Sequence, residues 1–173
     1  MKFFSANIED LRTLYLDSLQ KAFDMEQKIT DALPKMIDKT SDYDLASAFA
    51  THLEETKGHV TRLEALLRQA TGEASTTKCK VISALITEAE DSIKDATDPS
   101  VRDVALIAAG QQVEHHEIAV YGTLRSWAEL LGLRDHAIVL DSILEDEHNA
   151  DEVLTSISDR VNVTAETTAS RVA

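Results

Sequence analysis

One stretch of the sequence, residues 113–121 (VEHHEIAVY), limits what this chain can fold into more than any other. It lies in a long run without a helix breaker after Pro99, so we expect it to be helical. Spacings of three and four residues place Glu114, Glu117 and Tyr121 on one helix face. That face is apolar at both ends, because it reads Ile107, Gly110, Glu114, Glu117, Tyr121 and Leu124. Burying it would bury two carboxylates, each of which needs a proton, a base or a metal ion.

Composition favours an all-helical protein of one domain. The 173 residues include only 5 Gly and 2 Pro, and 43% of them are hydrophobic. A formal charge of −14 repels nucleic acid and anionic lipid, so we expect neither as a partner. The single cysteine, Cys79, excludes an internal disulfide and cysteine-based metal sites. The first residues lack the apolar region of a signal peptide, and no apolar run approaches the ~20 residues of a membrane span. We therefore expect a cytoplasmic protein with no part in the membrane.

Periodicity predicts four long helices and one short helix. The long helices are expected at residues 7–39, 43–70, 100–131 and 133–159, and the short one at residues 74–97. Asn7, residues 40–42 and Ser100 are candidate N-caps, and Gly72 and Gly132 are candidate stops. Short loops make the first two and the last two long helices antiparallel pairs, joined by about thirty residues that include the short helix. The predicted fold is all-α, a ferritin-like four-helix bundle with one long crossover over residues 1–160, followed by a frayed tail at residues 161–173.

Polar residues interrupt the apolar face of each of the other three long helices as well. Glu26 is the only charge on the face of the first helix, and His52, Glu55 and His59 share the face of the second. Glu147 and Asp151 lie between leucines on the last. This distribution matches a dinuclear carboxylate site built inside a bundle. A wet seam or an oligomer contact is the competing interpretation, but so many acids at one level would repel one another strongly without a cation.

We therefore predict a metal site in the bundle core. Carboxylates with one imidazole suit two iron ions, with manganese as the other choice, better than zinc or copper. Bridging roles are predicted for Glu55 and Glu147, and Glu117 is expected to swing in. The full set of predicted ligands is Glu26, Glu55, His59, Glu114, Glu117, Glu147 and Asp151.

A second pair of residues on the last helix offers an alternative to Glu147 and Asp151. Glu145 and His148 reproduce the Glu-x-x-His pattern of dinuclear bundle sites. Their helix face is largely charged, so the helical phase turns them toward water. We prefer Glu147 and Asp151 and keep Glu145 and His148 as the alternative.

Four segments resemble the YciE/YciF-type family of bacterial ferritin-like proteins: residues 49–56 (FATHLEET), 101–109 (VRDVALIAA), 113–124 (VEHHEIAVYGTL) and 144–151 (LEDEHNAD). The resemblance extends over nearly the whole chain, to residue 160. It implies a rubrerythrin-like helical fold, a homodimer and an association with stress responses, and no settled reaction. Glu114 and Glu117 match the acid pair of rubrerythrin. Its Glu-x-x-His on the second helix is not met, because Gly58 stands three residues after Glu55 and His59 one residue later.

The similarity to rubrerythrin also bears on electron supply. Rubrerythrins carry a cysteine-rich module that one cysteine cannot form, so any electron donor would be a separate protein. The expected function is a di-iron carboxylate protein that reacts with peroxide or oxygen under stress. The alternative is a structural or interaction protein whose bundle binds metal only for stability. Both alternatives need the same ligands, so the sequence leaves them open.

Overall fold

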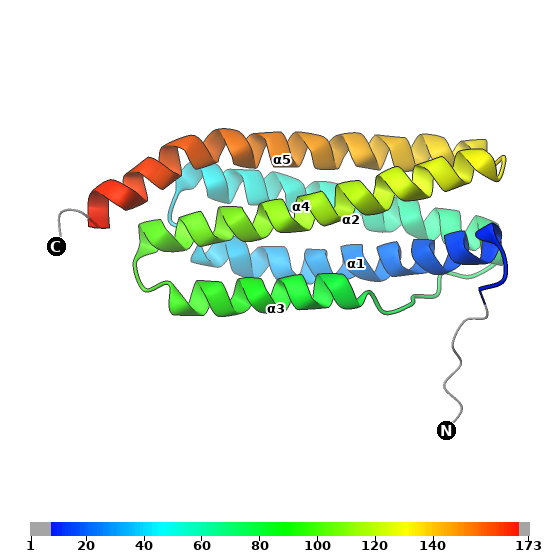
Figure 1. The fold of residues 1–173 in the computed structure, drawn as a ribbon, viewed down its shortest axis with the longest axis horizontal. Helices are drawn as coiled ribbons and strands as arrows, with labels where there is room; N and C mark the ends of the chain where they lie inside the picture. Colours follow the sequence, from blue (N-terminus) through cyan, green and yellow to red (C-terminus); the bar gives the residue numbers. More distant parts are fainter. Residues whose placement is uncertain (1–7, 170–173) are drawn as a thin grey trace, which may run out of the picture.

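The computed structural model describes residues 8–169 as five α-helices. They are α1 (Leu11–Lys39), α2 (Tyr43–Thr71), α3 (Lys80–Asp95), α4 (Pro99–Leu130) and α5 (Arg134–Ala169). The four long helices lie side by side along one axis, and the short α3 lies against α1 and α4 (Figure 1). The prediction of an all-α bundle with a short helix in its crossover is confirmed. None of the helices in the described part of the chain is long and apolar enough to cross a membrane.

The order of the helices follows from the lengths of their connections. Three residues separate α1 from α2, and three separate α4 from α5, so each pair turns back on itself. The segment between α2 and α4 crosses the length of the bundle and contains α3, so α2 and α4 run in the same direction (Figure 1). This arrangement brings one face of each long helix to the same axis.

Aspartates begin three of these helices, and glycines allow two of the turns. The side chains of Asp10, Asp42 and Asp98 accept hydrogen bonds from backbone N–H groups in the first turns of α1, α2 and α4. Gly72 and Gly132 adopt φ values of 86° and 73°, which residues with a side chain rarely adopt. The predicted stops are therefore confirmed. Ser100 is wrong as a cap because Pro99 already occupies the first turn of α4, and Asn7 lies outside the described residues.

A buried aspartate locks the α1–α2 connection onto α4. Asp103 is buried near the start of α4 and accepts hydrogen bonds from three donors. These are the backbone N–H of Ser41 at 2.8 Å, the Ser41 hydroxyl at 2.5 Å and the backbone N–H of Asp42 at 3.0 Å. The carboxylate is thus satisfied within the protein and fixes one end of the bundle.

Helix α5 is longer than the sequence analysis predicts. A frayed tail was expected from residue 161, but the helix continues to Ala169; residues 170–173 lie outside the described part. Val161 and Ala165 are buried, and the Arg160 guanidinium lies 2.6 Å from the Asp42 carboxylate and 2.9 Å from that of Asp44. These contacts hold the last turns against the start of α2. The prediction failed because two small apolar residues and one arginine make no recognisable stripe.

Candidate metal centre

Six buried polar side chains from four helices meet at mid-height in the bundle. Each long helix contributes, because each carries its polar residues in the middle of an apolar face. The side chains are Glu26 from α1, His52 and His59 from α2, Glu114 and Glu117 from α4, and Glu147 from α5. They form two groups in which one ligand atom from each residue lies within 4.8 Å of the others: His52, Glu114, Glu117 and Glu147 in one, and Glu26, His59 and Glu147 in the other. Glu147 belongs to both groups.

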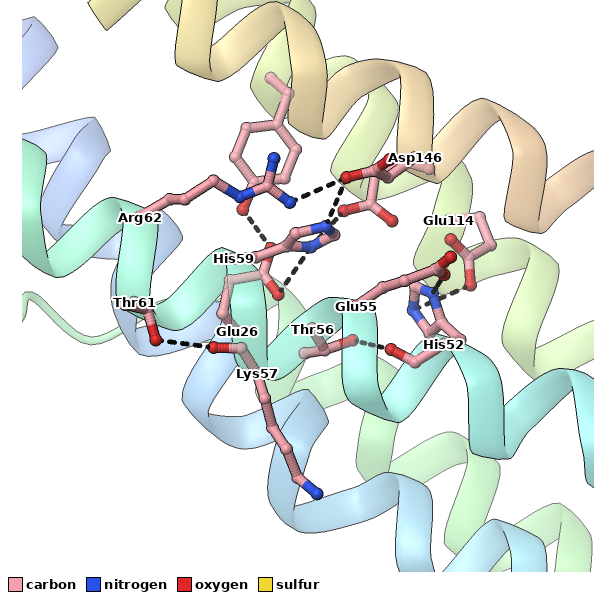
Figure 2. Close-up of polar contacts among 12 residues, drawn as sticks. Glu26, His52, Glu55, Thr56, Lys57, His59, Thr61, Arg62, Glu114 and Asp146 are labelled. Atoms are coloured by element: carbon pink, nitrogen blue, oxygen red, sulfur yellow. Dashed lines mark hydrogen bonds and ion pairs between the residues drawn. The ribbon is translucent and has the colours of Figure 1, made fainter.

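The His59 ring joins three carboxylates. Its Nδ1 lies 3.6 Å from Glu26 Oε2 (Figure 2). The same nitrogen lies 3.0 Å from Glu147 Oε1. Its Nε2 lies 3.2 Å from Asp146 Oδ2, and Asp146 in turn accepts a hydrogen bond from Arg62 at 2.8 Å. A carboxylate on the outer nitrogen orients an imidazole and fixes its tautomer. Asp146 therefore leaves Nδ1 of His59 directed at the buried acids.

Tyr121 holds one oxygen of the Glu26 carboxylate. Its hydroxyl donates a short hydrogen bond to Glu26 Oε1, and its ring meets the ring of His59 edge to face at 6.5 Å. The other oxygen, Glu26 Oε2, has no hydrogen-bond partner among the described residues. Tyr121 thus positions Glu26 with one oxygen directed at the cluster.

Many ligand atoms of the cluster have no hydrogen-bond partner within residues 8–169. They include both carboxylate oxygens of Glu117 and of Glu147, Oε2 of Glu114, both ring nitrogens of His52 and Nδ1 of His59. Buried polar atoms are almost always hydrogen-bonded, because leaving one without a partner costs roughly 1–3 kcal/mol. So many at one point is the arrangement expected of a site that binds cations, and the oxygen and nitrogen donors fit iron or manganese.

Burial and mutual repulsion change the proton affinities of the cluster. Burial, with neighbouring acids, raises the pKa of Glu114 to about 8 against the attraction of His52, and raises that of Glu117 well above its usual value. Burial also raises the pKa of Glu147. For the histidines, burial lowers the pKa but nearby carboxylates outweigh it, which raises His52 to about 9 and His59 to about 10. Without a cation, the cluster therefore retains protons at neutral pH.

The structure brings together five of the seven predicted ligands: Glu26, His59, Glu114, Glu117 and Glu147. Glu145 and His148 are exposed, as the helical phase predicts. The structure does not bring Glu55 or Asp151 into either group. The Glu55 side chain is 41% exposed, with Oε2 3.7 Å from Nδ1 of His52, and Asp151 lies 3.5 Å from the exposed His115. A role as metal ligands stays a prediction for both.

Sequence reasoning missed two residues of this region. His52 lies on the predicted stripe, one turn before Glu55, but was left out of the ligand set. The structure places its Nε2 3.4 Å from Glu114 Oε1, in the first of the two groups. Asp146 carries no signal in the sequence. Its helix face is recognisable only once α2 lies beside α5 and presents His59 to it.

Fold and cluster together define a class of protein, the ferritin-like helical bundle with buried carboxylates. Within this class, the chain belongs to the protein family described as Domain of unknown function (DUF892), whose sequence profile matches residues 10–168. It is 38% identical over 162 residues to protein YciF of Escherichia coli, and the match covers 92% of this chain and 98% of that protein. The resemblance found in the sequence is thus confirmed.

Solved structures agree with this placement. YcfI from Rhodopseudomonas palustris, named as a structural protein, is 39% identical with a TM-score of 0.85 and covers 88% of this chain and 98% of its own. The stress protein YciF of E. coli is 37% identical with a TM-score of 0.84, covering 88% and 97%. A ferritin-like, diiron-carboxylate protein of Bacillus anthracis is 17% identical with a TM-score of 0.68, covering 87% and 99%, which shows a shared fold alone.

Proposed function

We propose that the buried cluster binds two iron ions, or two manganese ions, and that the loaded protein consumes peroxide or oxygen in a stress response. The observation that carries the proposal is the set of buried carboxylate and imidazole atoms without a hydrogen-bond partner. Two divalent ions would compensate the charge that burial leaves unsatisfied.

The two groups suggest how the ligands divide. Glu147, common to both, is the proposed bridge. His52 and Glu114 serve one ion, Glu26 and His59 serve the other, and Glu117 lies with the first group. Bound iron would supply the redox capacity and an open coordination position for peroxide or oxygen. Tyr121 would hold Glu26 in place, and Asp146 would keep the Nδ1 atom of His59 free of a proton.

Two relatives support the parts of this proposal unequally. The B. anthracis protein is named for a diiron-carboxylate centre, and at 17% identity it lends the fold rather than the ligands. The E. coli relative is named a stress protein at 37% identity, which supports the physiological setting. A homodimer, a cytoplasmic location and a separate electron-donor protein are further parts of the proposal.

A structural role is the second candidate function. The R. palustris relative carries the name of a structural protein at 39% identity. In that case the ions would only hold the four helices together, and no reaction would follow their binding.

Iron titration in air separates the two candidates. The metal-free protein should take up close to two Fe(II) per chain, oxidise them, and remove added peroxide when a reductant is supplied. Uptake without oxidation or peroxide loss would favour the structural role. A folded protein that takes up no iron or manganese, by elemental analysis, would refute both.

A matched pair of variants tests the residue assignment. Glu147→Ala should remove at least one ion per chain, because it deletes the carboxylate common to both groups. His148→Ala, the next residue on the exposed face of α5, should leave the metal content unchanged. The reverse result would assign the site to Glu145 and His148.

A further inference from the structure

A groove with acidic side chains in its wall opens between α2 and α5 and leads to the cluster. Its volume is about 380 Å³. Its walls combine polar side chains with the apolar side chains of Phe49, Val153, Leu154 and Ile157. Two of the buried ligands form its inner end, and the polar lining includes Asp44, Thr51, His52, Glu55, Glu114 and Asn149. No lysine or arginine is among the lining residues. The groove is therefore suited to a cation rather than to an anion.

Glu55 stands at the outer end of this groove. Its side chain is 41% exposed, and within the described residues no lysine or arginine forms an ion pair with it. The other acid of the rim, Asp44, differs because Arg160 lies 2.9 Å from its carboxylate. Among the described lining residues, Glu55 is thus the one acid that is open to solvent and has no lysine or arginine partner; its carboxylate faces the imidazole of His52.

His52 connects this outer acid with the buried ones. One ring nitrogen, Nδ1, lies 3.7 Å from Glu55 Oε2, and the other, Nε2, lies 3.4 Å from Glu114 Oε1 (Figure 2). The ring is buried, and neither nitrogen has a hydrogen-bond partner in the part of the chain that the structure describes. Oε2 of Glu114 is likewise without one. Ligand atoms therefore follow one another from solvent to cluster: Glu55, His52, Glu114.

A second cavity reaches His52 and Glu114 from the opposite side, and it differs in chemistry. Its volume is only about 50 Å³. Apart from a rim that carries Lys35 and Glu90, its walls are mainly aliphatic, with Ile29, Leu33, Ile86 and Ile93. A cation passing there would lose its water without gaining ligands on the way.

We propose that divalent metal ions reach the cluster through the α2–α5 groove, with Glu55 as a transient first ligand that passes them to His52 and Glu114. The inference rests on the proposed metal centre. It gives Glu55, which the sequence analysis placed among the resident ligands, a role in the rate of loading rather than in the final content.

The test is the rate at which the metal-free full chain takes up Co²⁺, followed by visible absorbance, with the final content from elemental analysis. Glu55→Gln should load at least fivefold more slowly, because a solvent-facing charge steers and holds the arriving ion, yet reach the same content. Glu54→Gln is the matched control, since Glu54 is 72% exposed, pairs with Lys57 and does not line the groove. It should load within twofold of the wild-type rate. Raising the salt concentration should slow the wild type and Glu54→Gln more than Glu55→Gln.

A second pair of variants tests the groove itself. Ala150→Phe should obstruct it and slow loading, whereas Ala32→Phe, which fills the opposite cavity, should not. Equal rates for Glu55→Gln and Glu54→Gln, or for the two phenylalanine variants, would overturn the route. A lower final content in Glu55→Gln would make Glu55 a resident ligand and overturn its transient role. A wild-type chain that binds no cobalt, iron or manganese would instead refute the metal centre.

Discussion

Helix α4 buries carboxylates at two levels along its length, and the two levels differ in the hydrogen bonds that they receive. Asp103, near its start, accepts hydrogen bonds from Ser41 and from the Asp42 backbone. Glu117, fourteen residues further along the same face, is fully buried, and neither of its oxygens has a hydrogen-bond partner among residues 8–169. Both carboxylates are therefore buried, but only that of Asp103 has hydrogen-bond partners among the described residues.

The difference separates an acid that stabilises the fold from an acid that we propose binds a cation. Donors placed around Asp103 offset the free energy lost on leaving water, so that carboxylate needs nothing from outside. Around Glu117 the neighbours are Glu114 and Glu147, which add repulsion instead. The proposed cations would supply the compensating charge at the level of Glu117.

The largest effect should come from adding metal. Ions that bind only the folded state stabilise it by RT ln(1 + [L]/Kd), on the order of 3–4 kcal/mol at a few hundred times Kd. The free energies of unfolding of the metal-free and the Mn(II)-loaded protein, obtained from thermal melts at neutral pH, should differ by that amount. The gap should shrink on acidification, because ligation requires deprotonated carboxylates. A gap that is absent at neutral pH, or the same at all pH values, would contradict the metal centre.

The metal-free protein should itself respond to pH with a defined sign. The pKa of Glu114 is raised from 4.5 to about 8 in the fold, so the unfolded chain releases this proton first. Its contribution to stability is present at low pH and lost as the pH rises through that interval. The pKa of His52 is raised from 6.5 to about 9, which gives a loss of the same sign over its own interval. Stability without metal should therefore fall from about pH 4.5, where Glu114 begins to titrate in the unfolded chain, to about pH 9, where His52 loses its proton in the fold.

Replacing Asp103, the hydrogen-bonded acid, should give the next largest change in the free energy of unfolding. Asp103→Asn exchanges an acceptor oxygen for an amide that faces donors, so the free energy of unfolding should fall by about 2–3 kcal/mol. Denaturant unfolding measures it, and metal content should stay at the wild-type value. Asp91→Asn, an exposed change on α3, is the control with little expected effect. A loss of metal in Asp103→Asn would mean that the two levels are not independent.

Removing the Glu117 carboxyl group should change the free energy of unfolding in the opposite direction. Glu117→Met keeps a similar volume and removes a buried carboxyl group whose oxygens have no hydrogen-bond partner among the described residues, so the metal-free protein should gain about 1–2 kcal/mol at neutral pH. The same variant should bind less metal. Glu129→Met, on the exposed side of α4, should do neither. Destabilisation of the metal-free Glu117→Met protein would show that Glu117 is satisfied in solution, as Asp103 is.

The smallest effect should come from outside the cluster. Asp146→Asn weakens the contact that orients His59, and such partners of a ligating histidine are worth about tenfold or more in metal affinity. Competition with a chelator would measure the change. Asp141 lies on α5 like Asp146, but its carboxylate pairs with Arg125 of α4 at the surface. Asp141→Asn should therefore leave the metal affinity unchanged.

Most of the fold was predictable because its signals are local. Helical spacing, short loops and the glycines at positions 72 and 132 predict the helices and their antiparallel pairing. The failures are also physical. The end of α5 is held by Arg160 reaching Asp42 and Asp44, more than one hundred residues away in the sequence, and no local pattern shows this.

The site residues were predictable where helical phase alone tells which side chains face the bundle core. Phase alone separates the buried Glu147 from the exposed Glu145 and His148. Phase does not tell which residue of a polar run points deepest, and for that reason Glu55 was preferred to His52 on α2. The role of Asp103 was missed because its hydrogen-bond donors lie in the connection between α1 and α2. Only the assembled bundle brings Ser41 to it.

The place of Glu147 in both groups would make the two proposed ion sites thermodynamically dependent on each other. An ion in the first half would fix a carboxylate that the second half also uses and would reduce the repulsion around it. The second ion would then bind with a different affinity from the first, and the coupling free energy would be the same whichever half fills first. A binding isotherm for this protein should therefore need two linked constants rather than one constant for two equal sites.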